Sequence, residues 1–225
     1  MNIQKQYDKI ANDFASGQKE FFTKKEDQAR KFISSQLPSL KGKIVLDIGC
    51  GHGVDIVTYE KKGALEVFGI DSSRSMIEEA KKIVKRKDNL FVGSMEKMPF
   101  KNNQFDIIVG RFSIHYLKNI DKAYEEFNRV LKKNGLLIIV AHHPILGFMQ
   151  SGCRDYWKRK VIKMNLYKNK VKITFPYHTL TEYFSDKFFK FFTIDYLTEE
   201  DKNNLEYPNK WKVPGFLGFR AIRRA

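Results

Sequence analysis

The sequence has few cysteines, no long apolar run and no apolar leader, and each absence narrows the class of protein. Cys50 and Cys153 are the only cysteines among 225 residues, so a disulfide framework is not expected and a reducing cytoplasm is the natural location. No apolar run approaches the roughly 20 residues that a membrane-spanning helix needs, and we expect no membrane partner. The first residues, MNIQKQYDKIANDF, lack the apolar region of a signal peptide, so we expect none.

Acidic residues are scarce relative to basic ones. The chain has 41 Lys and Arg against 26 Asp and Glu, which gives a formal net charge of +15. Such a charge can attract nucleic acid, an anionic membrane or an acidic substrate. The abundance of Lys, Asn, Ile, Phe and Tyr is equally typical of an AT-rich genome, so the charge can be background composition. It is densest in residues 154–175, which hold eight Lys or Arg and one acid, Asp155.

The sequence does contain enough apolar residues for one sizeable core. Its length fits a single domain with a small added lobe. Aliphatic runs alternate with amphipathic segments, which favours an α/β fold with a doubly wound parallel sheet. Spaced apolar residues before Pro38 predict two amphipathic helices separated at Ser16-Gly17. The predicted strands are 44–48, 67–70, 90–92, 105–109, 136–141 and two closing strands, 191–197 and 215–222. The predicted helices are 54–62, 123–131 and one capped by Ser72 or Ser75 that ends near residue 85. After residue 144 the pattern predicts only a helix, an extended piece at 171–176 and a helical turn at 180–184.

Three alternate glycines follow the first predicted strand, in the stretch VLDIGCGHGVD. Glycine is favoured where the backbone needs a positive φ or where a ligand comes close. Ligands of open parallel sheets bind beyond the carboxyl ends of the strands, and the amides of a loop that opens a helix can hold an anionic group. The spacing G-x-G-x-G places Val54 where the dinucleotide fingerprint G-x-G-x-x-G has its third glycine.

An acid ends the second predicted strand, in the stretch GID. Asp71 lies 22 residues after Gly49, where a carboxylate can accept hydrogen bonds from both hydroxyls of a ribose. The alternative is that Asp71 only caps the following helix. The order of strand, loop, helix, strand and acid favours a nucleotide-containing cofactor.

Five motifs in this order resemble the class I S-adenosylmethionine-dependent methyltransferases, of the group called methyltransferase type 11. They are VLDIGCGHG, FGIDSS, GSMEKMPF, FDIIVGRFSIHYL and RVLKKNGLLIIV, and the resemblance covers roughly residues 40–142. It implies a Rossmann-like, seven-stranded, mostly parallel sheet and S-adenosyl-L-methionine as the cofactor. Within a single domain it implies a helical cap at 1–37, a cofactor-binding core at 40–142, a substrate-side insertion at 145–185 and closing strands at 186–225.

The resemblance also implies roles for individual positions. Asp47 and the amides of the glycine loop would hold the methionine end, Asp71 the ribose, and Arg111 would face the sulfonium. Tyr7 and Phe14, in the pattern Y-x-x-x-A-x-x-F, resemble the helix that covers the cofactor in this group. The implied cofactor-binding residues are Tyr7, Asp47, Gly49, Cys50, Gly51, Asp71, Ser72, Ser94, Met95 and Arg111.

Two positions depart from the family pattern. The family usually has an acid at the position of Ser94, where it bonds the adenine amino group, and a serine hydroxyl can replace it more weakly. The turn KKNG stands where the family has KPGG, and Asn134 tolerates the left-handed conformation that this turn needs.

Histidines near the strand ends are the candidate bases. His142 and then His115 are favoured because both follow strands that border the expected methyl site, and a histidine base is well tuned near neutral pH. His143 and His178 are weaker candidates, and each histidine can instead be structural. Methyl transfer from a sulfonium is an in-line displacement, so no metal is expected.

Three functional classes stay open: methylation of a small molecule, methylation of RNA, and cofactor binding without turnover. Segment 145–180 combines aromatic and basic residues, which suits a small aromatic or apolar metabolite methylated at O or N under an aromatic lid. The same segment could track RNA phosphates and stack bases, although no base-methylation motif such as N/D-P-P-Y/F occurs. The third class is a protein that binds the cofactor without turnover. A simpler interpretation of the segment is that its lysines face solvent and its aromatics form core.

Overall fold

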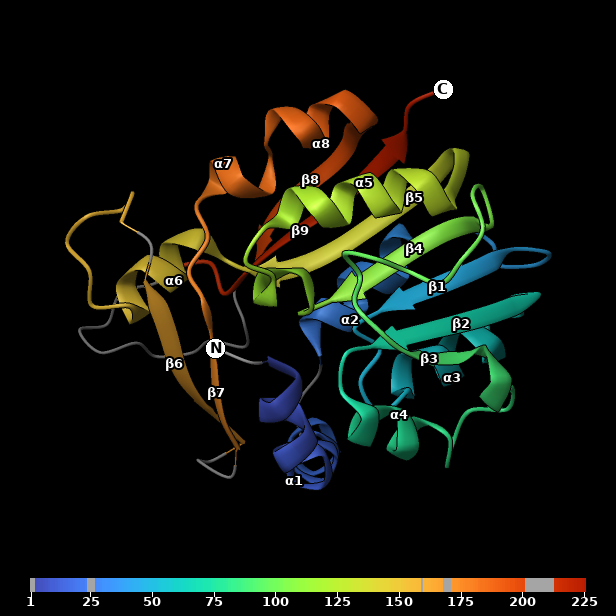
Figure 1. Ribbon diagram of the computed structural model, residues 1–225, viewed down its shortest axis with the longest axis horizontal. Coiled ribbons are helices and arrows are strands. Elements are labelled where there is room, and N and C mark those ends of the chain that lie inside the picture. The colour runs from blue at the N-terminus through green and yellow to red at the C-terminus, as the bar shows by residue number, and fades with distance from the viewer. Residues whose placement is uncertain (1–2, 24–26, 159, 168–170, 201–212) are drawn as a thin grey trace.

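A central sheet of seven strands organises the molecule (Figure 1). The computed structural model describes residues 3–23, 27–158, 160–167, 171–200 and 213–225. Within them the strand order is β3-β2-β1-β4-β5-β9-β8. The strands are β1 (Ile44–Ile48), β2 (Glu66–Asp71), β3 (Leu90–Val92), β4 (Phe105–Arg111), β5 (Leu131–His142), β8 (Phe192–Glu200) and β9 (Phe216–Arg223). The pairs from β3 through β5 are parallel and β9 runs antiparallel to both of its neighbours, so the predicted α/β fold with a mostly parallel seven-stranded sheet is confirmed.

Helices cover both faces of this sheet. On one face are α2 (Gln28–Gln36), α3 (Val54–Lys61) and α4 (Arg74–Ala80), and on the other are α5 (Ile120–Val130) and α8 (Asp186–Phe191) (Figure 1). Three shorter elements are η1 (Lys87–Asn89), η2 (Ile114–Tyr116) and α7 (Leu180–Tyr183). The central strands are buried on both faces, as parallel strands between two helical layers must be.

The sequence of α5 illustrates how one helical layer forms. Asn119 caps the helix by accepting a hydrogen bond from the Asp121 amide at 3.0 Å. Apolar residues then recur at helical spacing on one side, and all of them are fully buried against the sheet: Ala123, Tyr124, Phe127 and Val130. The Tyr124 hydroxyl donates to the carbonyl of Tyr183, which fixes α7 beside this layer.

A separate cover lies beyond the carboxyl ends of the parallel strands. It consists of α1 (Ile3–Thr23) and the antiparallel hairpin of β6 (Val161–Leu166) and β7 (Val171–Pro176), which α6 (Pro144–Gln150) joins to β5 (Figure 1). The Gln6 side chain joins the two parts because it accepts from the Thr174 amide at 2.9 Å and donates to the Thr174 carbonyl at 3.3 Å. Two segments far apart in sequence therefore form one lid.

The structure corrects three local predictions. Residues 16 and 17 do not break the first helix, since α1 continues through them to Thr23. Gly17 instead allows close packing, because a Cβ there would lie 2.8 Å from Cδ2 of Tyr167. The cap of α4 is Ser73, whose hydroxyl accepts from the Met76 amide and donates to Asp8, rather than Ser72 or Ser75. This helix ends at Ala80, before the predicted residue 85.

Candidate active site

All the predicted cofactor-binding residues and the two favoured histidines line one cavity of about 890 Å³ at the carboxyl ends of the parallel strands. They are Tyr7, Asp47, Gly49, Cys50, Gly51, Asp71, Ser72, Ser94, Met95, Arg111, His115 and His142. Further lining residues that the sequence did not single out come from α1, the glycine loop, α3, the loop after β3 and α6. They include Gln18, His52, Asp55, Glu96 and Gln150.

The glycine loop packs tightly on one side and is open on the other. Gly49 has φ +65°, and a Cβ there would lie 2.4 Å from the Cβ of Ser113. Gly51 also has a positive φ, +54°, but a Cβ there would meet no atom within 4 Å. Gly49 is therefore required by packing beneath the loop, whereas Gly51 leaves open space at the cavity.

The loop amides do not match the expectation that they hold an anionic group. The amides of Gly49 and Cys50 both donate to the carbonyl of Ile70, at 2.8 and 3.1 Å. The Gly51 amide donates to the Asp71 carboxylate at 2.9 Å. Because these hydrogens have acceptors inside the protein, the loop offers a ligand close approach rather than a nest of free donors.

Asp71 both shapes the loop and faces the cavity. One carboxylate oxygen accepts from the Gly51 amide and the other from the Ser73 amide at 2.8 Å. Each oxygen keeps a second lone pair, so the cap role and a ligand role are compatible. Burial raises the pKa of Asp71 above its ordinary value, against the lowering effect of these backbone hydrogen bonds.

Asp47, at the end of β1, has a buried carboxylate that is only partly satisfied. Among the described residues its Oδ2 atom has no hydrogen-bond partner. Burial is the main cause that raises the pKa of Asp47, and the neighbouring Asp55 adds to it. An unsatisfied acceptor that borders a cavity is suited to a cationic or N–H-bearing ligand group.

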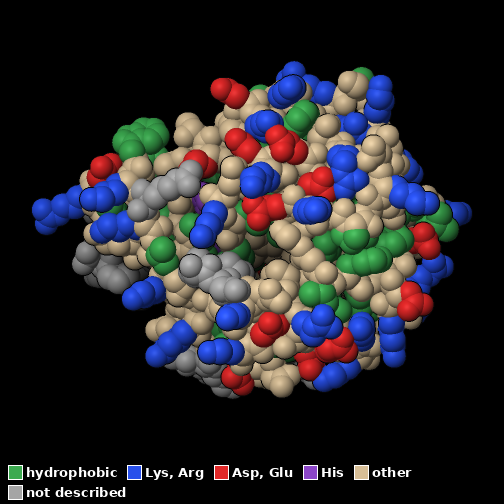
Figure 2. Space-filling view, in the orientation of Figure 1, with side chains coloured by type: hydrophobic (Ala, Val, Ile, Leu, Met, Phe, Trp, Pro, Cys, Tyr) green, Lys and Arg blue, Asp and Glu red, His purple; other side chains and the backbone are tan. Residues whose placement is uncertain are grey.

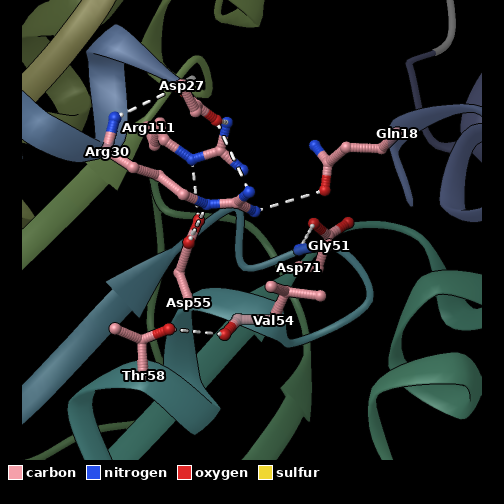
Figure 3. A network of polar contacts seen from close by, with 9 residues as sticks. All are labelled: Gln18, Asp27, Arg30, Gly51, Val54, Asp55, Thr58, Asp71 and Arg111. Carbon is pink, nitrogen blue, oxygen red and sulfur yellow. Dashed lines mark hydrogen bonds and ion pairs between the residues drawn. The ribbon is translucent and has the colours of Figure 1, made fainter. Parts of the chain in front are cut away.

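A cluster of four charged residues, Asp27, Arg30, Asp55 and Arg111, lies beside the cavity, and two of them, Asp55 and Arg111, line it (Figure 3). Asp55 accepts from Nε of Arg30 at 2.6 Å and from Nε of Arg111 at 2.7 Å. Asp27 lies 3.5 and 3.4 Å from the same two guanidinium groups. Gln18 of α1 accepts from Arg30 at 3.3 Å and ties the lid to this cluster.

Charge pairing dominates the electrostatics of this cluster. Burial opposes ionisation of Asp55, but Arg111 and Arg30 keep its pKa below the ordinary value. Burial likewise opposes the charge of Arg111, but Asp55 and Asp27 raise its pKa. The His52 imidazole beside them has a pKa lowered to about 4 by burial and by the Arg111 charge. Sequence reasoning found Arg111 but missed its partners Asp27 and Asp55, because they come from two other elements, the start of α2 and the first turn of α3.

The expected adenine side lies in the loop after β3. Ser94 accepts a hydrogen bond from the Glu96 amide at 3.1 Å, so its hydroxyl hydrogen stays available as a donor. Glu96 lines the cavity two residues further on. This acid was not predicted, and it lies close to the place where the family pattern expects a carboxylate.

His115 and His142 meet at the opposite end of the cavity, with the Phe175 ring packed against both. Phe175 lies 4.8 Å from the His115 ring and 5.0 Å from the His142 ring, between centroids. The His142 amide donates to Nδ1 of His115 at 3.4 Å, and His142 Nε2 lies 3.1 Å from Oε1 of Gln150. Because a backbone N–H can only donate, neutral His115 holds its own proton on Nε2.

The other two candidate histidines do not line this cavity. His143 caps α6 by accepting from the Ile145 amide at 3.1 Å, and its Nε2 lies 2.7 Å from Glu199. His178 Nε2 lies 2.8 Å from the carbonyl of Leu117. These contacts give both residues structural roles.

The lid meets the core at a pair of tyrosines. The hydroxyls of Tyr7 and Tyr116 share a short hydrogen bond, and Phe14 packs edge-on against Tyr7 at 5.6 Å. Burial raises the pKa of both tyrosines, so both are protonated at neutral pH. The apolar lining of the hairpin side consists of Met164, Leu166, Ile173 and Phe175.

The described residues contain neither a helix suited to span a membrane nor a cluster suited to bind a metal ion. None of their helices has the length and apolarity to cross a bilayer. No group of three or more His, Cys, Asp or Glu side chains is placed to hold a metal ion within those same ranges. Both cysteines have free thiols.

Comparison with known proteins matches this chain to methyltransferases. The family described as "Methyltransferase domain" matches residues 46–139. A malonyl-[acyl-carrier protein] O-methyltransferase of Legionella pneumophila is 32% identical over 149 residues, 63% of this chain and 50% of that protein. A demethylmenaquinone methyltransferase of Staphylococcus aureus is 30% identical over 141 residues, 61% of this chain and 56% of that protein. The chain thus spans about half the length of these curated relatives.

A solved structure shows the same fold. An S-adenosylmethionine-dependent methyltransferase from Mesorhizobium loti superposes with a TM-score of 0.70 at 19% identity. The superposition covers 85% of this chain and 95% of the other. At this identity the likeness concerns the fold, and it extends beyond the segment that the family matches.

Proposed function

Because the chain belongs to the class I S-adenosylmethionine-dependent methyltransferases, we propose that it transfers a methyl group to an oxygen or nitrogen atom of a small-molecule acceptor. One observation supports this proposal above the others. A single cavity joins the glycine loop and Asp71 to the pair His115 and His142 under an aromatic lid. Its volume of about 890 Å³ lies in the upper part of the usual range for ligand pockets, so it has room for a second ligand beside the cofactor.

The residues present fit S-adenosylmethionine. The unsatisfied Oδ2 of Asp47 suits its ammonium group, and the lone pairs left on Asp71 suit the ribose hydroxyls. The open space above Gly51 lets a ligand approach the backbone. Because the Gly49, Cys50 and Gly51 amides are used internally, we assign the cofactor carboxylate to the Arg111 side of the cavity. Ser94, Met95 and Glu96 border the place for the adenine.

The protein's share of the chemistry is mainly positioning. Bound in this cavity, the cofactor supplies a methyl group that is already activated on a sulfonium. Holding the acceptor in line with that methyl can contribute up to about 7–11 kcal/mol through proximity and orientation. The lid formed by α1 and the hairpin excludes water from the reacting groups.

We assign the proton acceptor to His142, with Gln150 as its positioning residue. In the tautomer in which Nε2–H of His142 donates to Oε1 of Gln150, Nδ1 is the atom that takes the proton of the acceptor. Gln150 therefore stays bonded to Nε2 before and after proton transfer. His115 is less suited, because its Nδ1 accepts from a backbone amide and its Nε2 holds a proton. It is better suited to donating a hydrogen bond to the acceptor molecule.

The lining supports an apolar or aromatic small molecule over RNA. Among the described aromatic residues of 154–177, Tyr156 and Tyr167 are half-buried, Phe175 and Tyr177 are buried, and only Trp157 is exposed. A base-stacking platform needs several exposed rings. The lysines described in this segment are exposed, while Arg159, Lys168 and Lys170 lie outside the described residues.

We also infer a cytoplasmic location, because both cysteines are free thiols, as is usual in a reducing compartment.

The first experiment is transfer of a radiolabelled methyl group from S-adenosylmethionine into fractionated host extract. We expect label in the small-molecule fraction, and its absence after replacement of His142 by Ala at unchanged cofactor affinity. Label in RNA would favour the alternative acceptor. No label in any fraction, with cofactor binding intact, would favour a protein that binds the cofactor without turnover.

A further inference from the structure

Three exposed apolar side chains lie at one end of the lid hairpin, where Trp157 precedes β6, Val161 begins β6 and Leu180 begins α7 after β7. Trp157 is 71% exposed, Val161 50% and Leu180 43%. We call these three residues the Trp157 patch. Burying large apolar groups is the usual outcome of folding, so three such exposed side chains in one place indicate an interaction site.

Contacts beneath the patch hold its members together. The Leu180 amide donates to the hydroxyl of Tyr156 at 3.0 Å, and the Tyr156 ring packs edge-on against Trp157 at 5.1 Å. Val161 pairs with Pro176 in the hairpin. Beside this pair, the Tyr177 amide donates a hydrogen bond of 2.8 Å to the Lys160 carbonyl. The three apolar side chains therefore sit on one ordered support.

The hairpin separates this patch from the cavity. Side chains alternate between the two faces of a strand, so exposed residues follow one another at every second position. Val161, Lys163 and Lys172 are exposed, whereas Ile162, Ile173 and Phe175 are buried toward the core. The outer face is thus apolar and basic, and the inner face is apolar and lines the cavity.

Positive charge surrounds the patch. Among the described residues of 154–172, the exposed basic residues are Arg154, Lys158, Lys160, Lys163 and Lys172, and the exposed acid is Asp155. Glu182, the nearest acid on α7, is directed inward because its carboxylate accepts from the Thr179 amide at 2.8 Å. Figure 2 shows Lys and Arg side chains crowded on the left edge of the molecule, where β6 and β7 lie in Figure 1.

We propose that the Trp157 patch docks the protein on an anionic lipid surface. Tryptophan and aliphatic side chains insert at the boundary between headgroups and acyl chains, and flanking basic residues are attracted to anionic lipids. Four of the five basic residues are Lys, which protein–protein interfaces disfavour but whose long stems suit a membrane interface. A single exposed ring is too few for stacking along RNA. This proposal replaces the expectation of no membrane partner, which considered only a spanning helix.

Docking here places the lid hairpin against the lipid. An apolar acceptor dissolved in the bilayer would then be concentrated beside the lid. This consequence rests on the proposed methyl transfer, whereas the docking itself does not, so a binding experiment tests it separately.

The test is sedimentation of the full chain with phosphatidylcholine vesicles, with and without phosphatidylglycerol. We expect binding only to the anionic vesicles, weakening as salt rises. Trp157→Ala should weaken the partition coefficient about tenfold. Lys158→Gln and Lys160→Gln should each weaken it about fivefold at low salt. These side chains are exposed, and unchanged cofactor affinity checks that each variant is folded.

A matched control removes one exposed apolar side chain and one exposed lysine at a distant place on the surface. Leu65 is 57% exposed and Lys62 is exposed, both at the opposite ends of the strands from the cavity. Leu65→Ala with Lys62→Gln should bind vesicles like the parent protein. Equal loss in this control, no binding to anionic vesicles at low salt, or wild-type binding by Trp157→Ala would overturn the proposal. Binding of an RNA oligonucleotide that depends on Trp157, without vesicle binding, would replace it by a nucleic-acid surface.

Discussion

Replacing Asp55 by Asn should destabilise the protein strongly, although Asn has nearly the same shape. The carboxylate forms charge-assisted hydrogen bonds of 2.6 and 2.7 Å to Arg30 and Arg111, each worth about 1.5–3 kcal/mol. Both guanidinium groups keep Asp27 at 3.5 and 3.4 Å, so the loss is partial. We expect about 3 kcal/mol, the lower end for breaking a buried ion pair. For a chain of this size that lowers Tm by about 6–12 °C.

The assay is urea unfolding followed by circular dichroism, with Asp195→Asn as the control. Arg220 donates to Asp195 in three hydrogen bonds of 2.8–3.0 Å, but this pair lies on the surface. Its loss should cost less than about 1 kcal/mol because water screens the charges. If the two variants lose equal stability, or if Asp55→Asn loses less than the control, burial does not decide the strength of these pairs and the reasoning fails.

The pH dependence of this site provides an additional check on Asp55→Asn. The pKa of Asp55 is below its ordinary value in the folded protein, so its contribution is present above the ordinary pKa near 4. That contribution disappears as pH falls through the folded pKa. The difference in unfolding free energy between the parent and Asp55→Asn should therefore shrink in acid.

Three further predictions concern the loop, the cofactor and the lid. His52 has a pKa of about 4 in the folded protein against an ordinary 6.5, so unfolding takes up a proton between these pH values. The free energy of unfolding should therefore fall by about 3 kcal/mol as pH drops from 6.5 to 4. His52→Asn should flatten this part of the stability curve, as urea midpoints measured across pH would show. Asp71→Ala should weaken S-adenosylmethionine binding by about 1–3 kcal/mol in a calorimetric titration, and unchanged affinity would contradict the ribose assignment. Gly17→Ala should destabilise the protein because its Cβ would lie 2.8 Å from Cδ2 and 2.9 Å from Cβ of Tyr167. In a Tyr167→Gly background, which removes both atoms, the same change should stabilise α1 by up to about 1 kcal/mol, as thermal unfolding would reveal.

Periodic burial made much of the fold predictable from sequence. Strands such as β1 and β3 are short aliphatic runs, and their predicted bounds match the structure. Asn134 adopts φ +59° in the predicted turn. One failure is tertiary in origin, because Gly17 resembles a helix breaker in sequence but its role is set by Tyr167. The strand β6 was missed although apolar and polar residues alternate from Ile162 to Leu166, the local pattern of a half-buried strand.

Whether a site residue could be predicted also depends on whether its signal in the sequence is local. Motif positions such as Asp71 were found because the chain order of a nucleotide fold leaves a local sequence signal. Asp27, Arg30 and Gln150 were missed, since each matters only through a partner distant in sequence. An acid in the first turn of α3, Asp55, is the one local signal that could have pointed to the ion cluster.

The lid joins two segments that lie 168 residues apart, and this has a consequence for exchanging parts between relatives. Gln6 serves as a surrogate strand neighbour for Thr174, while the neighbouring Tyr7 meets the core at Tyr116. A hairpin transplanted from another enzyme to alter acceptor preference would leave the amino-terminal helix without its docking partner. Chimaeras that exchange both segments together should retain cofactor affinity, whereas hairpin-only chimaeras should lose it even though every motif residue of the core is still in place.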